Sequence, residues 1–321
     1  MRNPAGPEAF RELICGLVKS RSKVVIATHS RADVDALSSA YALSLVLPGS
    51  VIGTSEEMTE GARMLSEKLG IGASDLAKID KGAFQGLIAV DTSTYVLAPA
   101  AKGWRILAVI DHHRGEGRDM KGEFEIIEPE SPSTAELIAN LLDEKDISVA
   151  AAFALSVGII ADGARFKSAR ANTFKTLGRL MEKTGDSYHE LLEYAEPSPK
   201  DDVKIALLSA MKRVEYVYAA GYVIATSEVG SNESDAASLI TEAADVAFVA
   251  KWKEMEKETR ISARASKSVK VPLNKVMDEV GKSLGGAGGG HNKAAGASVK
   301  AHTKEALKKC VDVFISFAEK G

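Results

Sequence analysis

Aspartate and histidine side chains, which bind divalent metal ions without sulfur, follow several apolar segments of this chain. Asp111, His112 and His113 form an uninterrupted triplet directly after the apolar run 106–110. Further residues of this kind stand at or near the ends of other apolar segments: His29, Asp33, Asp35, Asp91 and Asp162. Oxygen and imidazole ligands without thiolates favour Mn²⁺, Mg²⁺, Co²⁺ or Fe²⁺ over a structural zinc ion. The residue types therefore predict a metal site.

The number of these ligands points to two metal ions. Five or more ligands are too many for one tetrahedral ion, and they suit two ions about 3.5–4 Å apart that share a bridging carboxylate. Such a pair polarises a phosphoryl oxygen and lowers the pKa of a bridging water, which supplies hydroxide for an in-line displacement. We therefore expect a metal-dependent hydrolase that acts on phosphoesters.

Taken singly, most of these residues have simpler explanations. Asp33 could be the N-cap of the next helix, and His29 could be a satisfied histidine at a strand end. Asp91 could be another cap, and Asp162 could belong to a plain turn. The Asp-His-His triplet has no comparable structural use after a buried strand. Because several coincidences would be needed to explain the whole set, the set favours a metal site.

The elements that must position these side chains alternate between strand and helix over residues 1–185. Short apolar runs predict strands at 24–28, 51–53, 87–90, 106–110 and 124–127. Helices are expected at 35–47, 56–69, 133–143 and 149–161. Continuous apolar strands that alternate with helices are typical of a parallel sheet covered on both faces. Ligands of such sheets bind beyond the carboxyl ends of the strands, where His29, Asp91 and the triplet stand.

The length of 321 residues exceeds the usual size of one hydrophobic core, so two domains are expected. A proline-containing segment at 196–202 cannot continue a helix. We therefore predict a catalytic metal-binding domain at 1–190, a linker at 191–205 and a substrate-binding domain at 206–321. The last part predicts a hairpin at 214–227, strands at 245–252, 259–265 and 297–299, and helices at 273–284 and 303–319. The fold class is α/β, with an N-terminal parallel-sheet domain and a smaller α+β C-terminal domain.

The composition is that of an ordinary soluble protein, with 45% hydrophobic and 26% charged residues. A net charge of −3 gives no general sign of nucleic-acid binding. Cys15 and Cys310 are too few for a disulfide framework or a cysteine zinc site. Signal-peptide and membrane-spanning patterns are not found. We expect a cytoplasmic protein without a membrane partner. A homodimer is compatible with the sequence.

A glycine cluster and a basic segment mark a second candidate site near the C-terminus. The cluster at 285–290 ends in three glycines that a histidine follows: Gly288, Gly289, Gly290 and His291. Backbone N–H groups free of side chains can form an anion-binding nest. The segment 260–270, which includes Arg264, has four basic residues and no acidic one, as expected for phosphate contacts. A flexible hinge and a solvated face are the alternatives.

In this order, the motifs resemble those of the DHH phosphoesterase superfamily with its DHH-associated C-terminal domain, and the nanoRNase-like, oligoribonuclease-like and RecJ-related proteins within it. The matching segments are His29-x-x-x-Asp33-x-Asp35-Ala36, Val90-Asp91-Thr92, Asp111-His112-His113, Gly158-Ile159-Ile160-Ala161-Asp162 and Gly288-Gly289-Gly290-His291. The likeness covers nearly the whole chain. The first motif departs from the common Asn-Pro-Asp-Gly-Asp form, because Arg31 and Ala32 stand at its start.

The resemblance implies a role for each candidate residue. One Mn²⁺ would be held by His29, Asp33 and Asp91. The other would be held by Asp35, Asp91, His112 and Asp162, so that Asp91 bridges the two ions. Asp111 would orient an imidazole, and His113 would contact the scissile phosphate or help to protonate the leaving oxygen. The far end of the substrate would be bound by Arg264, Gly288, Gly289, Gly290 and His291.

The resemblance also implies an activity. It suggests a Mn²⁺-dependent phosphodiesterase or exonuclease, with Mg²⁺ or Co²⁺ as other options, that hydrolyses short single-stranded RNA or DNA or dinucleotides. Cyclic di-AMP and 3′-phosphoadenosine 5′-phosphate are alternative substrates. A DHH-type inorganic pyrophosphatase would lack the glycine-histidine signature. A non-catalytic, replication-associated scaffold would tend to lose metal ligands, whereas every ligand position is filled here.

Overall fold

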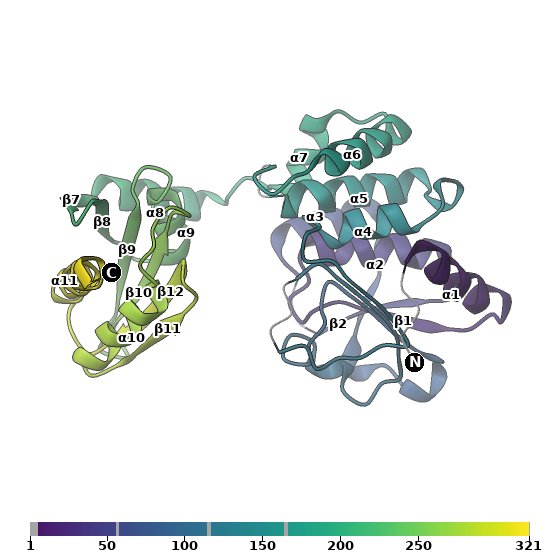
Figure 1. Ribbon diagram of the computed structural model, residues 1–321, viewed down its shortest axis with the longest axis horizontal. Helices are drawn as coiled ribbons and strands as arrows, with labels where there is room; N and C mark the ends of the chain where they lie inside the picture. Colours follow the sequence, from purple (N-terminus) through teal and green to yellow (C-terminus); the bar gives the residue numbers. More distant parts are fainter. Residues whose placement is uncertain (1–5, 56–57, 114–116, 164–165, 321) are drawn as a thin grey trace. The chain divides into compact units, whose positions relative to one another are not determined.

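A computed structural model of the chain describes residues 6–55, 58–113, 117–163 and 166–320. The chain divides into two compact units, 1–198 and 199–321, called unit 1 and unit 2 (Figure 1). Unit 1 contains a parallel sheet and unit 2 a smaller mixed sheet with helices, which confirms the predicted fold class. In the described part of the chain, no helix is long and apolar enough to cross a membrane.

Unit 1 is built on a six-stranded parallel sheet with the order β3-β2-β1-β4-β5-β6. Its strands are β1 (Val24–Ala27), β2 (Val51–Thr54), β3 (Ala73–Asp75), β4 (Gly86–Val90), β5 (Ile106–Asp111) and β6 (Phe124–Ile127). Every residue of β1, β4 and β5 is buried, as parallel strands covered on both faces require. The strand order reverses between β1 and β4, so the crevice beyond their carboxyl ends is the expected ligand position.

Helices cover one face of this sheet. They are α1 (Pro7–Lys19), α2 (Val34–Val46), α3 (Glu60–Leu69), α4 (Thr134–Leu141), α5 (Val149–Asp162), α6 (Ala171–Thr184) and α7 (Tyr188–Ala195). Figure 1 shows α2 and α4 next to the sheet, α5 beyond them, and α6 and α7 farther out. The middle of α5 is apolar on all sides and buried, because α2 and α4 contact it from within and α6 and α7 from outside.

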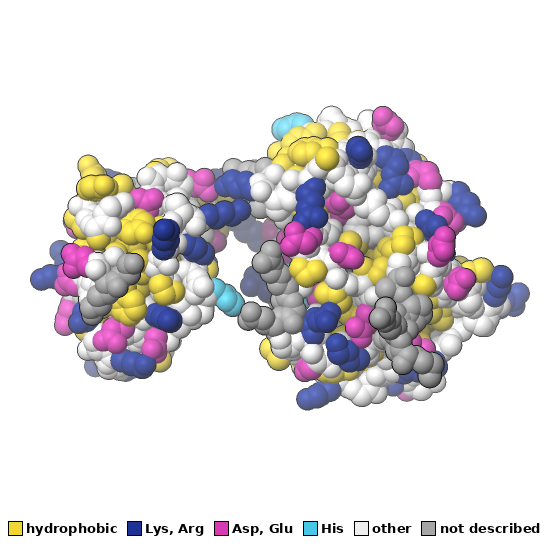
Figure 2. Space-filling model, in the orientation of Figure 1, with side chains coloured by type: hydrophobic (Ala, Val, Ile, Leu, Met, Phe, Trp, Pro, Cys, Tyr) yellow, Lys and Arg dark blue, Asp and Glu magenta, His cyan; other side chains and the backbone are white. Residues whose placement is uncertain are grey.

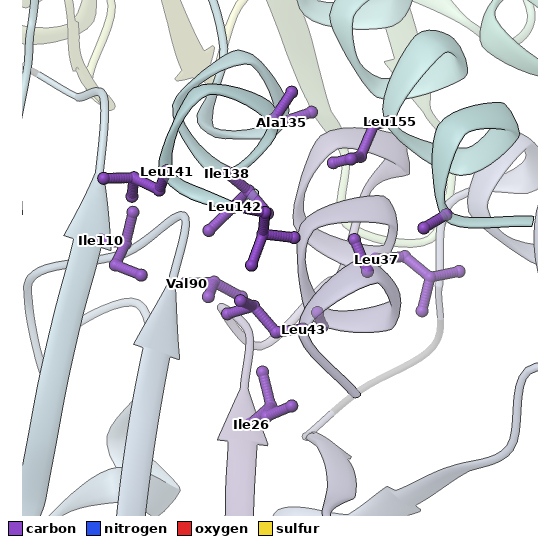
Figure 3. Packing of buried hydrophobic residues seen from close by; sticks show 14 of the residues in the cluster. Ile26, Leu37, Leu43, Val90, Ile110, Ala135, Ile138, Leu141, Leu142 and Leu155 are labelled. Atoms are coloured by element: carbon purple, nitrogen blue, oxygen red, sulfur yellow. The ribbon is translucent and has the colours of Figure 1, made fainter. Parts of the chain in front are cut away.

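Alternate strand residues point to opposite faces of the sheet. Ile26 and Val90 belong to the core under the helices, where Leu37 and Leu155 also lie (Figure 3). Val25 instead packs on the other face, in a second cluster. That face is covered, as predicted, but by loops and short 3₁₀ turns rather than by α-helices. The turns of unit 1 are η1 (Leu76–Lys78), η2 (Lys81–Ala83), η3 (Pro99–Ala101) and η4 (Glu144–Asp146).

Unit 2 contains a six-stranded mixed sheet with the order β11-β12-β10-β9-β8-β7. Its strands are β7 (Glu215–Ala219), β8 (Tyr222–Glu228), β9 (Val246–Lys253), β10 (Glu258–Ala265), β11 (Ala287–Gly290) and β12 (Ala294–Val299). Its helices are α8 (Asp201–Lys212), α9 (Glu233–Ile240), α10 (Leu273–Ser283) and α11 (Thr303–Lys320). Only the β8–β9 pairing is parallel. The core around Phe248 and Phe314 lies on the α10–α11 side, and a smaller cluster packs under α8 and α9.

Three features of the fold were not expected from the sequence. The strand β3 and the helices α6, α7, α8 and α9 were not anticipated. The glycine cluster, expected to be a loop, contributes the edge strand β11 because its backbone pairs with β12. Most of the predicted linker, 191–205, is helical: α7 continues to Ala195, where Tyr194 packs on Phe153 with ring centroids 5.5 Å apart, and α8 begins at Asp201. The functions assigned to the two domains stay predictions.

Candidate metal centre

Three neighbouring strands of unit 1 bring polar residues to the same edge of the sheet. β1 pairs with β4, and β4 pairs with β5. His29 stands two residues beyond β1, Asp91 follows β4 directly, and Asp111 is the last residue of β5. Their side chains therefore meet at the carboxyl edge, where the strand order reverses.

The first group of possible ligands consists of His29, Asp33 and Asp91. His29 Nε2 lies 3.7 Å from Asp33 Oδ2 and 3.5 Å from Asp91 Oδ2. Asp33 is also the N-cap of α2, because its Oδ1 accepts a hydrogen bond of 3.0 Å from the N–H of Ala36. The capping role and the metal-facing role use different oxygens, so the two explanations of Asp33 are compatible.

The second group consists of Asp35, His112 and Asp162. His112 Nε2 lies 3.1 Å from Asp162 Oδ2 and 3.9 Å from Asp35 Oδ2. Asp162 is the last residue of α5, where a negative charge opposes the helix dipole and costs about 0.3–1 kcal/mol. A cation at this position would offset that cost.

Gly158 explains how α5 comes close enough to supply Asp162. A Cβ at Gly158 would lie 2.2 Å from Ser38 Oγ and 2.8 Å from the Cβ of Ala135. It would also lie 3.3 Å from Asp35 Oδ1. The glycine of the fourth motif thus permits α5 to pack directly against α2 and α4 beside the Asp35 carboxylate.

Asp91 stands between the two groups. Its Oδ2 faces His29, and its Oδ1 lies 3.5 Å from His112 Nε2. Each carboxylate oxygen therefore faces a different histidine, which is the arrangement that a bridging ligand requires. The backbone of Asp91 has a φ of 60°, a left-handed conformation that aspartate tolerates better than most residues and that recurs at functional sites.

The N-terminus of α4 contributes residues that the sequence did not identify as functional. The Thr134 hydroxyl donates a 2.8 Å hydrogen bond to Asp91 Oδ1, and its backbone N–H donates to Asp35 Oδ2 at 2.7 Å. The N–H of Ala135 donates to Asp35 Oδ1 at 2.8 Å. A helix N-terminus stabilises carboxylates in this way. The sequence predicted the helix, but its spacing alone does not show which carboxylates its N-terminus reaches.

Asp111 turns away from the two groups and holds His113. Its Oδ1 lies 2.8 Å from His113 Nδ1 and also accepts a 3.1 Å hydrogen bond from the His113 backbone N–H. This contact raises the pKa of His113 above its ordinary value. His113 Nδ1 also lies 3.6 Å from Asp91 Oδ1, and Asp91, His112 and His113 form a third possible ligand group.

The electrostatics of the site fit bound cations. Burial alone would lower the pKa of His29, but the carboxylates of Asp33 and Asp91 outweigh it and raise that pKa to about 10. Burial and the neighbouring carboxylates raise the pKa of Asp35 well above its usual range. His112 Nε2 is buried, and no group among the described residues meets hydrogen-bond geometry with it, although carboxylate oxygens lie 3.1 and 3.5 Å away. Divalent cations would satisfy this nitrogen and neutralise the buried carboxylates.

The second predicted site lies entirely within unit 2. A pocket of about 510 Å³ is lined by β10, β11, β12 and the first turn of α9. Arg260, Ser262 and Arg264 line it from alternate positions of β10 and therefore share one face of the strand. Arg264 is held by a 2.6 Å hydrogen bond to Ser234 Oγ, and Arg260 forms an ion pair of 3.1 Å with Glu233. The pocket thus has two guanidinium groups at its wall.

The predicted glycines have different places around this pocket. Gly288 and Gly289 line it. Gly288 is required by packing, because a Cβ there would lie 1.9 Å from the carbonyl oxygen of Met277, whereas a Cβ at Gly289 would meet nothing within 4 Å. Gly290 and His291 lie beyond the pocket wall, at the turn into β12, and His291 is exposed. Gly289 therefore offers an open backbone face to the pocket rather than a nest.

Sequence comparison agrees with this arrangement of two units. Residues 23–159 match the profile of the DHH family, N-terminal domain, and residues 220–320 match that of the DHHA1 domain. The chain belongs to the DHH phosphoesterase superfamily. The two matches confirm the predicted DHH domain and its DHH-associated C-terminal domain.

Several known proteins are similar to this chain. An uncharacterized protein of Methanocaldococcus jannaschii is 34% identical over 213 residues, and the chain spans 64% of the length of that relative. The same match covers 64% of this DHH chain. An exopolyphosphatase-related protein from Bacteroides fragilis superposes with a TM-score of 0.74 over 97% of both chains at 15% identity. CDC45 from Entamoeba histolytica has a TM-score of 0.55 over 98% of this chain and 99% of its own, at 9% identity. These two likenesses show the fold alone.

Proposed function

We propose that this DHH protein is a Mn²⁺-dependent phosphodiesterase or exonuclease that hydrolyses short single-stranded oligonucleotides or dinucleotides. The unit 2 pocket carries the proposal, because two guanidinium groups and an open glycine face line it. The metal centre lies in unit 1. The pocket volume of about 510 Å³ is within the range of small-molecule sites. Such a pocket suits a substrate that extends beyond its scissile phosphate.

The metal centre would hold two divalent cations, and Mn²⁺ is the proposed ion at both positions. His29, Asp33 and Asp91 would bind one ion, and Asp35, Asp91, His112 and Asp162 the other. When bound, the ions supply an activated water and polarise the scissile phosphoryl group. Thr134 would keep Asp91 in its bridging orientation through the hydroxyl hydrogen bond.

His113 is the proposed proton donor. Asp111 fixes its ring through Nδ1 and raises its pKa, so the imidazole is more readily protonated near neutral pH. A protonated His113 could hydrogen-bond the phosphate and deliver a proton to the leaving oxygen. Asp111 would then act by positioning His113 and would not bind metal.

The unit 2 residues would bind the rest of the substrate. Arg264 and Arg260 could pair with a phosphate, since guanidinium groups match phosphate geometry. The bare backbone at Gly289 would let a base or sugar approach closely. His291 is exposed near this glycine and would also contact the substrate.

The same features bear on other substrates and on other classes of protein. Cyclic di-AMP and 3′-phosphoadenosine 5′-phosphate also carry a nucleotide part and stay alternatives. Pyrophosphate has no base or sugar, so the unit 2 pocket and the DHHA1 match argue against a pyrophosphatase. A non-catalytic scaffold would not need the ligand groups that cluster in unit 1.

A hydrolysis screen with added Mn²⁺ tests the proposal. Short RNA and DNA oligonucleotides, dinucleotides, cyclic di-AMP, 3′-phosphoadenosine 5′-phosphate and pyrophosphate would be compared for wild type and Asp91→Ala. We expect cleavage of short oligonucleotides or dinucleotides by wild type and none by Asp91→Ala, which should also lose Mn²⁺ binding in calorimetry. Cleavage of pyrophosphate alone would exclude the proposed substrate class, and a wild type that neither binds Mn²⁺ nor hydrolyses any substrate would exclude the enzyme.

A further inference from the structure

One edge of the unit 2 sheet is formed by β7, a strand with little cover on either face. Four of its five residues are exposed, and Tyr216 and Tyr218 are 78% and 73% exposed. Its single charged residue, Glu215, stands at its first position, and it contains no lysine or proline. Soluble proteins usually protect sheet edges with such residues or with very short strands. β7 therefore lacks the common devices that prevent another strand from pairing with it.

The free backbone groups of β7 follow from its hairpin with β8. The hairpin turns through Ala220 and Gly221, both with positive φ, and Ala219 pairs with Tyr222 next to this two-residue turn. Ala219 and Tyr222, which flank the turn, exchange backbone hydrogen bonds. Along an antiparallel ladder, such hydrogen-bonded pairs alternate with pairs that exchange none. Odd-numbered residues of β7 thus bond to β8. The N–H and C=O groups of Tyr216 and Tyr218 consequently point outward from the edge.

Apolar side chains extend from this edge onto the neighbouring helix. Tyr216 pairs with Ala225, which belongs to the cluster packed under α8 and α9, so both tyrosines project on the α8 side of the sheet. On α8, exposed Ile205, Leu208 and Met211 recur every three residues and form one stripe. Figure 2 shows hydrophobic side chains at the end of unit 2 where Figure 1 labels β7. We call the two tyrosines, Val217 and the α8 stripe the β7 edge.

We propose that the β7 edge is a homodimer interface, in which β7 pairs antiparallel with β7 of a second copy. A two-fold axis at Val217 sets Tyr216 of each chain opposite Tyr218 of the other, and these are the residues with outward backbone groups. Cross-strand aromatic pairs stabilise such sheets. Glu215 is set opposite Ala219, so this register brings no like charges together. The same axis places the two α8 stripes on one side of the joined sheet.

The size of the β7 edge is sufficient for a dimer. Its six side chains are 39–78% exposed and expose on average about 100 Å² each, on the scale of 150–250 Å² for a whole aromatic side chain. If the interface covered all of this area, it would bury about 600 Å² per chain, or about 1,200 Å² in total, which reaches the lower end of stable interfaces. The other edge of this sheet, β11, consists of alanine and glycine and offers no comparable apolar area.

Light scattering after size exclusion tests the proposal on the full-length protein. We expect wild type to have about twice its chain mass of 34.0 kDa at micromolar concentration. The double variant Tyr216→Lys/Tyr218→Lys should be monomeric, because four lysines would meet at the two-fold axis. Met255→Lys is the matched control, since Met255 is 97% exposed in the turn between β9 and β10, and it should remain dimeric.

Hydrogen exchange distinguishes strand pairing from a contact elsewhere. In wild type, the N–H groups of Tyr216 and Tyr218 should exchange more slowly as the protein concentration rises, because pairing protects them. Unchanged fast exchange at these two residues, a monomeric wild type, or a double variant that stays dimeric would each overturn the proposal. Unchanged thermal melting of the double variant in the monomeric range would show that the substitutions leave the fold of unit 2 intact.

Discussion

The Thr134 hydroxyl links the N-terminus of α4 to the bridging carboxylate, and Thr134→Val would remove that link alone. The hydrogen bond to Asp91 Oδ1 is 2.8 Å long and fully buried, and the backbone bond to Asp35 would remain. A hydrogen bond to a charged acceptor contributes about 1.5–3 kcal/mol. If Mn²⁺ binding depends on the orientation of Asp91 that this bond fixes, loss of the bond should weaken Mn²⁺ binding about 10- to 100-fold.

Isothermal titration with Mn²⁺ would measure this change, and thermal melting in EDTA would report the structural part of the effect. Thr134→Ser is the matched control, because it keeps the hydroxyl and removes only a methyl group. It should bind Mn²⁺ within a few-fold of wild type. The reasoning would be refuted if Thr134→Val bound Mn²⁺ as tightly as wild type, or if Thr134→Ser lost as much affinity as Thr134→Val.

Three further outcomes are expected. Arg264→Met should raise the KM for a dinucleotide about 10- to 100-fold while leaving Mn²⁺ affinity unchanged in calorimetry; equal loss of both would contradict a substrate role. Gly158→Ala should lower the free energy of unfolding by about 1–3 kcal/mol in urea titrations, because the added Cβ would lie 2.2 Å from Ser38 Oγ. The control Gly178→Ala in α6 should not destabilise the protein, because its Cβ would point into open space. Folding raises the pKa of His29 from 6.5 to about 10. In EDTA, the contribution of protonated His29 to the free energy of unfolding is therefore fully present below pH 6.5 and is lost as the pH rises toward 10. Over that window the melting temperature of the metal-free protein should fall, and the stabilisation by Mn²⁺ should grow; a flat difference would argue against proton–metal competition.

Much of unit 1 could be predicted because its strands are short apolar runs with little ambiguity. The segments around Val24, Leu87 and Ile106 lie in strands within one or two residues of their predicted bounds. Polar residues that directly follow such strands must share the carboxyl edge of a parallel sheet. For that reason, the sequence alone predicts that His29, Asp91 and the triplet lie in one region.

The local role of the glycine cluster was harder to predict. Gly286 and Gly288 are needed because the backbones of Ser298 and Met277 approach too closely for a Cβ. Those contacts join residues that are far apart in sequence, so the local composition suggested a flexible loop instead of a strand. The open position, Gly289, cannot be distinguished from its neighbours by composition.

The sequence by itself determined which chemistry unit 1 can support, because ligand types and strand ends are local properties of the chain. Only the tertiary structure decided how the ligands divide. It set the two oxygens of Asp91 toward different histidines and placed the Asp111 carboxylate against His113. It also brought the Thr134 hydroxyl within hydrogen-bonding distance of Asp91, which is 43 residues away in the chain. These choices depend on how helices pack over the sheet, since a shift of an ångström or two would change which atoms are within hydrogen-bonding reach.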